Sequence, residues 1–474
     1  MKNKLLQNTL ILLITSLMIR LLSLLNRILL TRYLGEEGIS LYSLILPTIM
    51  LFMSLSCFSL NTAMIKVSAI HKNKKVINHG IIIAIITTSI SSIILLLILK
   101  YLSINLLKQK VTYYPILISI PALFLTSISS VLRGYLTGIE KVSDTSFANL
   151  IEQITRILFT ILVFILIPNK SITYYLILVI IAMSIGELFS IIFTSIRIKN
   201  LKIDNIILNN KISKELLDIA IPTTLTSLVS NITFFLEPII FTFVLTKLNF
   251  SSSDILLKYS EVTAYALPLI TLFSFISISI STVIMPKISV SNKETIKNYI
   301  EKLIILCLIP GLLLSTIFFN YSKEISFLLY NTYTGSILVK KYVWFFIVFY
   351  LISPFNAILQ STNQSKKAFI ISLITHILKL ILLFILPIFL SDSLIICYLL
   401  SYILTFLFQI IILYKQYKFK FPFKRIIYLL LITLNINFIC LILNYLNLNY
   451  IISIIILSFI FVILNFFFIK RNNI

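Results

Sequence analysis

The chain is too apolar to be a soluble protein. It has 474 residues, of which 59% are hydrophobic and only 12% are charged, and its mean hydropathy is +1.05. A soluble domain cannot bury so much apolar surface, so the composition indicates a protein that crosses a membrane many times.

Apolar runs of roughly 20 residues, the length that spans a bilayer, recur along the whole chain and predict about fourteen transmembrane helices. The intervals between them are short, so no inserted soluble domain is expected. The fold class expected is therefore an all-α integral membrane protein. The predicted helices cover residues 9–30, 39–65, 80–104, 114–136, 147–168, 173–196, 219–246, 259–286, 301–321, 337–360, 369–390, 394–414, 425–445 and 449–469.

Positive charge marks one side of the expected helices. Most Lys and Arg residues lie at the chain ends and in alternate loops, which predicts that both termini are cytoplasmic. The basic loop at 66–75 and the basic segment 415–425 are expected to lie on anionic lipids. His71 and His79 are expected to lie in the loop region between the helices predicted over 39–65 and 80–104. The net charge of +24 therefore indicates topology and a membrane partner, and no nucleic acid.

The sequence contains a weak internal repeat. LPTIMLF (46–52) recurs as LPLITLF (267–273), and the helices at 147–168 and 369–390 align with Arg156 opposite Lys379. Six helices return the chain to its starting side, so this pattern predicts two parallel-repeat six-helix lobes, a known transporter architecture. The predicted division is a first lobe at 1–205, a second at 206–418, and two extra transmembrane helices at 419–474.

The first predicted helix carries one polar stripe. Ser16, Arg20, Ser23 and Arg27 are spaced by four, three and four residues and so share one helical face. An ionised group at this depth costs about 2.5–3.5 kcal/mol and usually faces water or a partner. The functional interpretation is a hydrated cavity between the lobes that binds an anionic group such as phosphate. The alternatives are snorkelling, which suits Arg20 poorly, or a structural ion pair.

The seventh predicted helix repeats this spacing. Thr226, Ser230, Thr233 and Glu237 share one face, and Pro238 follows at once. A proline inside a helix frees a carbonyl, which at membrane depth needs a hydrated or protein-lined environment. Glu237 is therefore a candidate to bind a coupling cation, H⁺ or Na⁺, or to close the cavity. The alternative is a kink with a protonated, packed glutamate.

Other charges at helix depth allow structural and functional readings. Glu152 and Arg156 stand at i, i+4 with the acid first, which favours an intrahelical ion pair; they are also gating candidates. The remaining ionisable residues inside or at the start of predicted helices are Glu187, Glu261, His376 and Lys379.

No enzyme is expected. The three histidines, single cysteines and eight glycines form no metal-ligand, nucleophile or phosphate-loop pattern. We therefore expect no cofactor and no metal site, apart from the coupling cation.

Several stretches carry a resemblance to a known family. NRILLTRYLGEEGISLYSLILPT (26–48), LRGYLTGIEKVSDTSFANLIEQITRI (132–157), NITFFLEPII (231–240), YALPL (265–269) and STVIMPKIS (281–289) resemble the stage V sporulation protein B family. That family belongs to the polysaccharide-transport branch of the multidrug/oligosaccharidyl-lipid/polysaccharide exporter superfamily, whose lipid II flippases share a fourteen-helix layout.

The resemblance implies a flippase of a bacterial plasma membrane. Two lobes would alternate between inward- and outward-open states and move an undecaprenyl-pyrophosphate-linked sugar to the outer leaflet for peptidoglycan or a related polysaccharide. No direct ATP use is implied. The protein would be a monomer, and cell-wall synthesis proteins are candidate partners.

The resemblance also bears on single residues. Arg20 matches a helix-1 arginine that lipid II flippases place in their cavity. Asn26 occupies the position of a second such arginine, and Arg27 lies one residue beyond it. Two further cavity arginines have their places near Leu51 and Val262, where this chain is apolar. The kind of lipid-linked sugar is therefore left open. In this reading the GEEG turn (35–38) is an outer hinge between the first two helices.

Two other functions are compatible with these features. A cation-coupled multidrug exporter would use the same fold, but it would call for carboxylates where helix 1 presents arginines. A non-transporting scaffold of wall synthesis or sporulation would make the buried charges structural. We expect neutralising them to affect folding, and not lipid movement, in that case.

Overall fold

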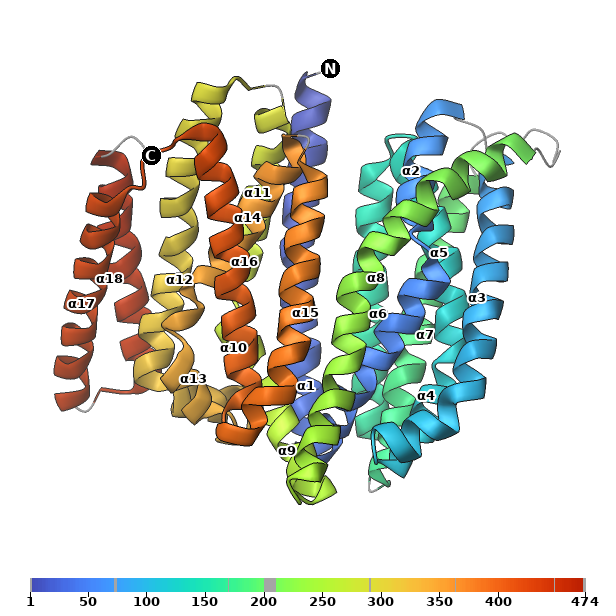
Figure 1. Cartoon of the computed structure of the whole chain (residues 1–474), viewed down its shortest axis with the longest axis horizontal. Helices are drawn as coiled ribbons and strands as arrows, with labels where there is room; N and C mark the ends of the chain where they lie inside the picture. Colours follow the sequence, from blue (N-terminus) through green and yellow to red (C-terminus); the bar gives the residue numbers. More distant parts are fainter. Residues whose placement is uncertain are drawn as a thin grey trace. The chain divides into compact units, whose positions relative to one another are not determined.

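The computed structural model shows a chain built from helices and turns (Figure 1). The structure describes residues 2–71, 75–168, 170–199, 210–289, 291–362, 364–446 and 448–471, and no β-strand occurs in these ranges. Contacts divide the chain into two compact units, Met1–Tyr259 and Ser260–Ile474. The lobe boundary predicted at 205/206 and part of the basic segment 66–75 lie outside the described residues.

The first unit consists of long helices that pack side by side. α5 packs on α2, α3 and α7, and α1 packs along α6 and α8. Buried Leu60, Met64 and Val67 of α2 form a core with Leu216 and Ala220 of α8. The helices and short helical turns of this unit are α1 (Lys2–Cys57), α2 (Leu60–His71), α3 (Lys75–Tyr101), η1 (Leu102–Leu106), η2 (Lys110–Thr112), α4 (Tyr113–Ile118), α5 (Ile120–Gly138), α6 (Val142–Leu166), α7 (Ile172–Lys199), α8 (Asn210–Lys247) and α9 (Ser252–Ser260).

α1 contains the turn that the GEEG sequence predicts. Gly35 has φ 68° and ψ −174°, which is a non-helical conformation inside an otherwise helical segment. A residue with a Cβ avoids this region, whereas glycine adopts it without strain. α1 is therefore two helices joined at Gly35, as the sequence indicates.

The second unit has two bent segments and several long helices. α11 packs on α14, α15 on α16, and α12 on α13, α14 and α17. Its elements are η3 (Glu261–Ala266), α10 (Leu267–Ile270), α11 (Ser274–Ser289), α12 (Lys293–Tyr330), α13 (Ser336–Tyr342), η4 (Phe345–Val348), α14 (Phe349–Ser361), α15 (Ser365–Phe389), α16 (Ser393–Tyr417), α17 (Phe423–Tyr445) and α18 (Tyr450–Arg471).

Many of these helices are long and apolar enough to cross a membrane. Among the described residues ten helices qualify, or up to twelve when two bent pairs each count as one span. The helix that ends at Ile270 meets α11 at 58°, and α13 meets the segment Phe345–Ser361 at 71°. The sequence predicts continuous helices over 259–286 and 337–360, so these bends correct the prediction.

Side-chain hydroxyls donate hydrogen bonds to backbone carbonyls at the breaks between helices. Backbone groups at membrane depth need partners inside the protein. The Ser56 carbonyl, next to the break between α1 and α2, accepts hydrogen bonds from Thr87 Oγ1 at 2.9 Å and Ser127 Oγ at 3.1 Å. The Ile270 carbonyl accepts one from the Tyr350 hydroxyl at 2.9 Å. The Val343 carbonyl accepts one from Ser315 Oγ at 3.3 Å. Each break is therefore held by a neighbouring helix.

Candidate functional site

The polar stripe of α1 keeps its polar groups accessible. Ser16 and Ser23 are exposed, and Arg20 and Arg27 are partly buried. Ser23 Oγ donates to the Ile19 carbonyl at 2.8 Å, so its lone pairs are the part of the hydroxyl left to meet a ligand. The four residues lie on one helical face as their spacing predicts.

Arg27 has polar neighbours close by. The adjacent Asn26 Oδ1 is buried and has no hydrogen-bond partner among the described residues. Tyr42, also on α1, is buried within electrostatic reach of both Arg27 and Arg156 of α6. Arg27 and Arg156 thus both act on the electrostatic environment of the Tyr42 hydroxyl.

The stripe of α8 runs from the surface into the interior of the first unit. Thr226 and Ser230 are exposed, Thr233 is 5% exposed and Glu237 is fully buried. Thr226 and Thr233 donate their hydroxyl hydrogens to backbone carbonyls of α8. The Tyr259 hydroxyl of α9 donates to Glu237 Oε1 at 3.3 Å. Glu237 is therefore the buried end of the stripe, and Pro238 beside it is also buried.

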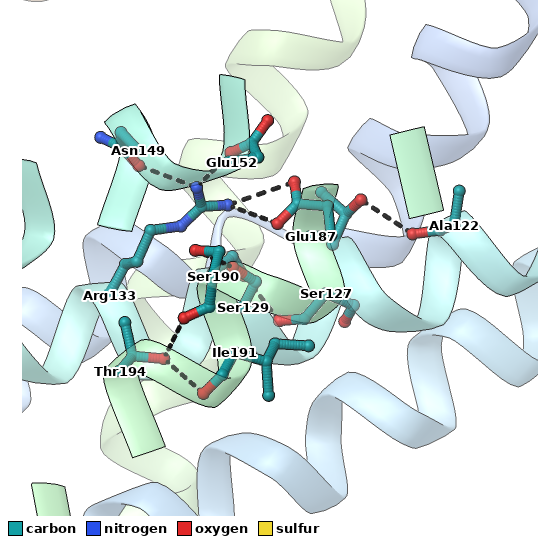
Figure 2. A network of polar contacts seen from close by, with 12 residues as sticks. Ala122, Ser127, Ser129, Arg133, Asn149, Glu152, Glu187, Ser190, Ile191 and Thr194 are labelled. Atoms are coloured by element: carbon teal, nitrogen blue, oxygen red, sulfur yellow. Dashed lines mark hydrogen bonds and ion pairs between the residues drawn. The ribbon is translucent and has the colours of Figure 1, made fainter. Parts of the chain in front are cut away.

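Three helices of the first unit bring together a cluster of four charges. Figure 2 shows three of them, Arg133, Glu152 and Glu187. Arg133 of α5 donates to Glu152 Oε2 of α6 at 2.7 Å and to Glu187 Oε2 of α7 at 3.1 Å. The same guanidinium donates to Asn149 Oδ1 at 2.8 Å. Arg156 pairs with the other oxygen of Glu152, which confirms the predicted i, i+4 ion pair. We call Arg133, Glu152, Arg156 and Glu187 the charge cluster.

The charge cluster is electrically balanced and buried. Glu152 and Glu187 are 8% and 3% exposed, and two guanidinium groups face two carboxylates. Buried charges are tolerated when they are paired and hydrogen-bonded in this way. Gly186 makes the arrangement possible, because a Cβ there would lie 2.8 Å from the Glu152 carbonyl oxygen. Close contact between α6 and α7 places Glu187 within reach of Arg133.

Arg133 is the residue that sequence reasoning missed. It lies inside the helix predicted over 114–136, yet it is not among the candidate residues of the sequence analysis. In the structure α5 extends to Gly138, and the Arg133 side chain is only 13% exposed. A signal was present in the sequence. Ser127, Ser130 and Arg133 recur every three residues, and Thr137 follows four later, which is a polar stripe on a helix.

His79 also differs from expectation. The basic segment suggested a loop, but α3 already begins at Lys75 and buries the ring. His79 Nδ1 lies 2.8 Å from Ser213 Oγ of α8, and His71 Nε2 lies 2.6 Å from Glu215 Oε2. Both histidines thus tie the first turns of α8 to α2 and α3.

The candidates of the second unit are dispersed. Glu261 is the first residue of η3, a π-helix, and is partly buried. Lys379 of α15 is 6% exposed, and its ammonium lies 3.3 Å from the centroid of the Tyr398 ring, a cation–π contact. Within the described residues, no three His, Cys, Asp or Glu side chains meet in a metal-binding arrangement.

Comparisons with known proteins identify the family. The sequence profile of the family described as "Polysaccharide biosynthesis protein" matches residues 5–251, more than half of the chain. The chain belongs to this family.

Two relatives from Bacillus subtilis (strain 168) extend the match to most of the chain. Stage V sporulation protein B is 28% identical over 405 residues, which cover 81% of this chain and 78% of that protein. Sporulation protein YkvU is 23% identical over 372 residues, 75% of this chain and 82% of the relative. These matches confirm the resemblance found in the sequence.

Solved structures show the fold of this polysaccharide biosynthesis family member. A structure titled "Lipid II flippase MurJ, inward closed conformation" matches with a TM-score of 0.75 at 18% identity, covering 97% of this chain and 99% of that one. An inward-facing multidrug resistance MATE family transporter matches with a TM-score of 0.58 at 14% identity, covering 86% and 99%. The fold is therefore the all-helical membrane fold shared by MurJ and MATE proteins.

The two positions that lack the implied arginines are apolar and buried in the structure. Leu51 on α1 is 8% exposed, and Val262 in η3 is 3% exposed. Of the four arginines that the resemblance implies, this family member has one at the matching position, Arg20. At the second position it has Asn26, and Arg27 follows one residue later.

Proposed function

We propose that the protein is a flippase that moves an undecaprenyl-pyrophosphate-linked sugar precursor from the inner to the outer leaflet by alternating access. The observation that carries this proposal is the stripe of α1, with two partly buried arginines on one face. A pyrophosphate is a dianionic group whose oxygens match the fork of guanidinium donors. Arg20 and Arg27 would bind the pyrophosphate, while the lipid tail stays in the bilayer.

The Ser and Thr side chains of the α1 and α8 stripes would bind the sugar of the precursor. Ser23, Thr226 and Thr233 already donate to carbonyls of their own helices. Their oxygens therefore act as acceptors, and sugar hydroxyls are abundant donors. Asn26 Oδ1 is a further acceptor without a partner among the described residues. Ser16 and Ser230 would complete the two stripes.

The proposed topology has fourteen spans and two cytoplasmic termini. The ten helices and two bent pairs give twelve; dividing α1 at Gly35 adds one, and α18, whose apolar part Tyr450–Asn465 is shorter, adds another. The loop charges favour cytoplasmic termini, with two parallel six-helix repeats at 1–205 and 206–418 and two further helices at 419–474. A monomer in a bacterial plasma membrane, with anionic lipids at its basic loops, fits this layout.

A cation gradient is the proposed energy source. Glu237 is the fully buried carboxylate of α8 and accepts a hydrogen bond from Tyr259, so binding of H⁺ or Na⁺ there would alter the packing of α8 and α9. Glu261 and Lys379 are secondary coupling candidates, and the charge cluster would keep α5, α6 and α7 together as one body during the movement.

The experiment measures outer-leaflet accessibility of labelled lipid-linked precursor in cells depleted of the protein and complemented with variants. We expect the wild type to restore accessibility and the double variant Arg20→Ala/Arg27→Ala to lose most of it. Arg32→Ala is the matched control, since Arg32 is an exposed arginine of the same helix. Full flipping by the double variant at normal protein level would refute the anion site.

The same measurements separate the two alternatives. A multidrug exporter would leave precursor accessibility unchanged on depletion, and its drug-resistance phenotype would disappear in Glu237→Gln. A non-transporting wall-synthesis scaffold would also leave precursor accessibility unchanged on depletion, without a drug-resistance phenotype. Its charge-neutralised variants would restore growth whenever they fold.

A further inference from the structure

The second unit contains a cavity of about 670 Å³, whose lining residues do not include any of the arginine stripe. It lies where α12 ends and where α13 and α18 begin, so three helix ends meet there (Figure 1). In the proposed topology the basic start of α12 faces the cytoplasm, so the other end of this helix lies on the outer side of the membrane. The cavity is thus at the level of lipid headgroups and external water.

The wall of the cavity is preformed. Tyr333 stacks on Phe327 of α12 with ring centroids 5.1 Å apart and an interplanar angle of 20°. The turn that carries Tyr333 is fixed at both ends by residues with positive φ, Asn331 at 60° and Gly335 at 76°. Ser336 Oγ donates to the Tyr333 carbonyl at 2.6 Å. A Cβ on Gly335 would lie 2.8 Å from the Tyr265 side chain, so this turn sits tightly against η3.

Charges of both signs border the aromatic pair. Lys323 and Glu324 of α12 line the cavity, together with Tyr450 at the start of α18. Neither Lys323 nor Glu324 forms a hydrogen bond or ion pair within the described part of the chain. Lys323 therefore supplies an ammonium donor, Glu324 a carboxylate acceptor and Tyr450 a phenol hydroxyl. The two charges cancel, so the cavity does not favour a simple cation or anion.

We infer that this cavity is a saccharide-binding site on the outer face. A sugar ring has C–H faces that pack on aromatic rings, whose faces carry negative charge density, and a rim of hydroxyls that both donate and accept. Phe327 and Tyr333 supply the aromatic surface, Glu324 accepts from hydroxyls, and Lys323 and Tyr450 donate to ring substituents. The volume lies within the range of small-ligand sites and suits one or two sugar rings.

The inference goes beyond the proposed function, because it concerns a second site on different helices that would hold a sugar after it reaches the outer leaflet. Its occupant is a neutral or weakly charged saccharide. A zwitterionic phospholipid headgroup would use Lys323 and Glu324 but would gain nothing from the stacked aromatic pair.

The test titrates the full-length protein in nanodiscs with N,N′-diacetylchitobiose and follows the sugar protons by saturation-transfer NMR. We expect binding to the wild type and a loss of about tenfold or more in affinity, or about 1.4 kcal/mol, for Tyr333→Ala. Glu324→Gln should weaken binding while keeping the shape of the cavity. Tyr445→Ala is the matched control, since Tyr445 is an 87% exposed tyrosine at the end of α17 that does not line the cavity.

Two further experiments distinguish this saccharide site from a sugar site on α1 and from a site for phospholipid headgroups. Arg20→Ala/Arg27→Ala should bind the disaccharide like the wild type, even where it fails to flip precursor, and a loss of binding there would move the sugar site to α1. Displacement of the disaccharide by glycerophosphoethanolamine would assign the cavity to a phospholipid headgroup and overturn the inference. Equal binding by the wild type and the Tyr333 and Glu324 variants, or no binding to any of them, would also overturn it.

Discussion

Arg133 and Glu187 are 54 residues apart in the sequence, yet their side chains form a buried ion pair of 3.1 Å. Arg133 comes from α5 and Glu187 from α7, and Glu152 of α6 completes the bridge on the other side of the guanidinium. The pairing therefore fixes three helices to one another at membrane depth. Because each carboxylate has a cationic partner, the arrangement tolerates burial that a lone charge would not.

Removing Arg133 should strongly destabilise the first unit. Arg133→Met leaves Glu187 buried without its ion-pair partner, which we expect to cost about 3–5 kcal/mol. The measurement is thermal unfolding of purified protein in detergent. The double variant Arg133→Met/Glu187→Gln should recover part of the loss, because it removes the orphaned charge as well.

The control for this variant is Arg197→Met. Arg197 is 47% exposed and lies 3.5 Å from Asp144, and exposed pairs contribute about 0–1 kcal/mol. If Arg133→Met and Arg197→Met shifted the unfolding temperature equally, the charge cluster would have no special structural role.

Gly186 should not accept a larger side chain. Its Cβ would lie 2.8 Å from the Glu152 carbonyl oxygen, a backbone atom that cannot move without moving α6. We expect Gly186→Val to cost about 1–3 kcal/mol in unfolding free energy, as overpacking typically does. Gly311→Ala is a milder comparison, since its Cβ would meet the Tyr350 ring at 3.0 Å, which is a side chain. A Gly186→Val protein as stable as the wild type would mean that α6 and α7 separate freely.

Local patterns in the sequence predicted the features that depend on local contacts. Most of each predicted helix lies in a helical segment of the structure, although the helices predicted over 39–65, 259–286 and 337–360 are broken. Apolar length is a local property of the sequence, and it determines where a helix can span a bilayer. The Glu152–Arg156 pair was predictable because i and i+4 face each other on any helix. The turn at Gly35 was predictable because Gly-Glu-Glu-Gly interrupts an apolar run.

Features that depend on tertiary contacts were not predicted. The breaks near Ser56, Ile270 and Val343 lie inside predicted helices, and hydroxyls from other helices donate hydrogen bonds to the carbonyls beside them. The partnership of Arg133 with Glu187 requires the close approach of α6 and α7. The roles of Arg20, Arg27 and Glu237 stay predictions, because they are inferred from the charge and position of these side chains and not from a bound ligand.

The Ser56 carbonyl allows a test of how a broken span is held. Two hydroxyls donate to it, Thr87 Oγ1 at 2.9 Å and Ser127 Oγ at 3.1 Å. Thr87→Val or Ser127→Ala alone should change stability little, since the other donor remains. The double variant leaves a buried carbonyl unsatisfied, which costs about 1–3 kcal/mol.

This double-variant cycle is read from the unfolding temperatures of the four proteins. We expect the combined loss to exceed the sum of the single losses, which marks two donors sharing one acceptor. Strictly additive effects would show that the two hydroxyls act independently, and the break between α1 and α2 would then need another stabilising contact.

Variants of Glu237 and Tyr259 can separate the response of flipping to a cation gradient from the contribution of these residues to stability. Tyr259→Phe removes the 3.3 Å hydrogen bond to Glu237 and keeps the ring against Phe241, where the centroids are 5.9 Å apart. We expect a loss of about 0.5–1.5 kcal/mol in stability and flipping that still responds to the cation gradient. Glu237→Gln keeps the shape of the side chain and removes its charge, so flipping should lose its response to a gradient of H⁺ or Na⁺ in vesicles.

The control is Glu301→Gln, because the Glu301 carboxylate accepts a hydrogen bond from the backbone N–H of Lys420 in an exposed position and is in the second unit. That variant should flip with an unchanged gradient response. If Glu237→Gln also kept the full response at normal protein level, Glu237 would be a packed structural acid at the Pro238 kink, and the coupling site would have to be sought at Glu261 or Lys379.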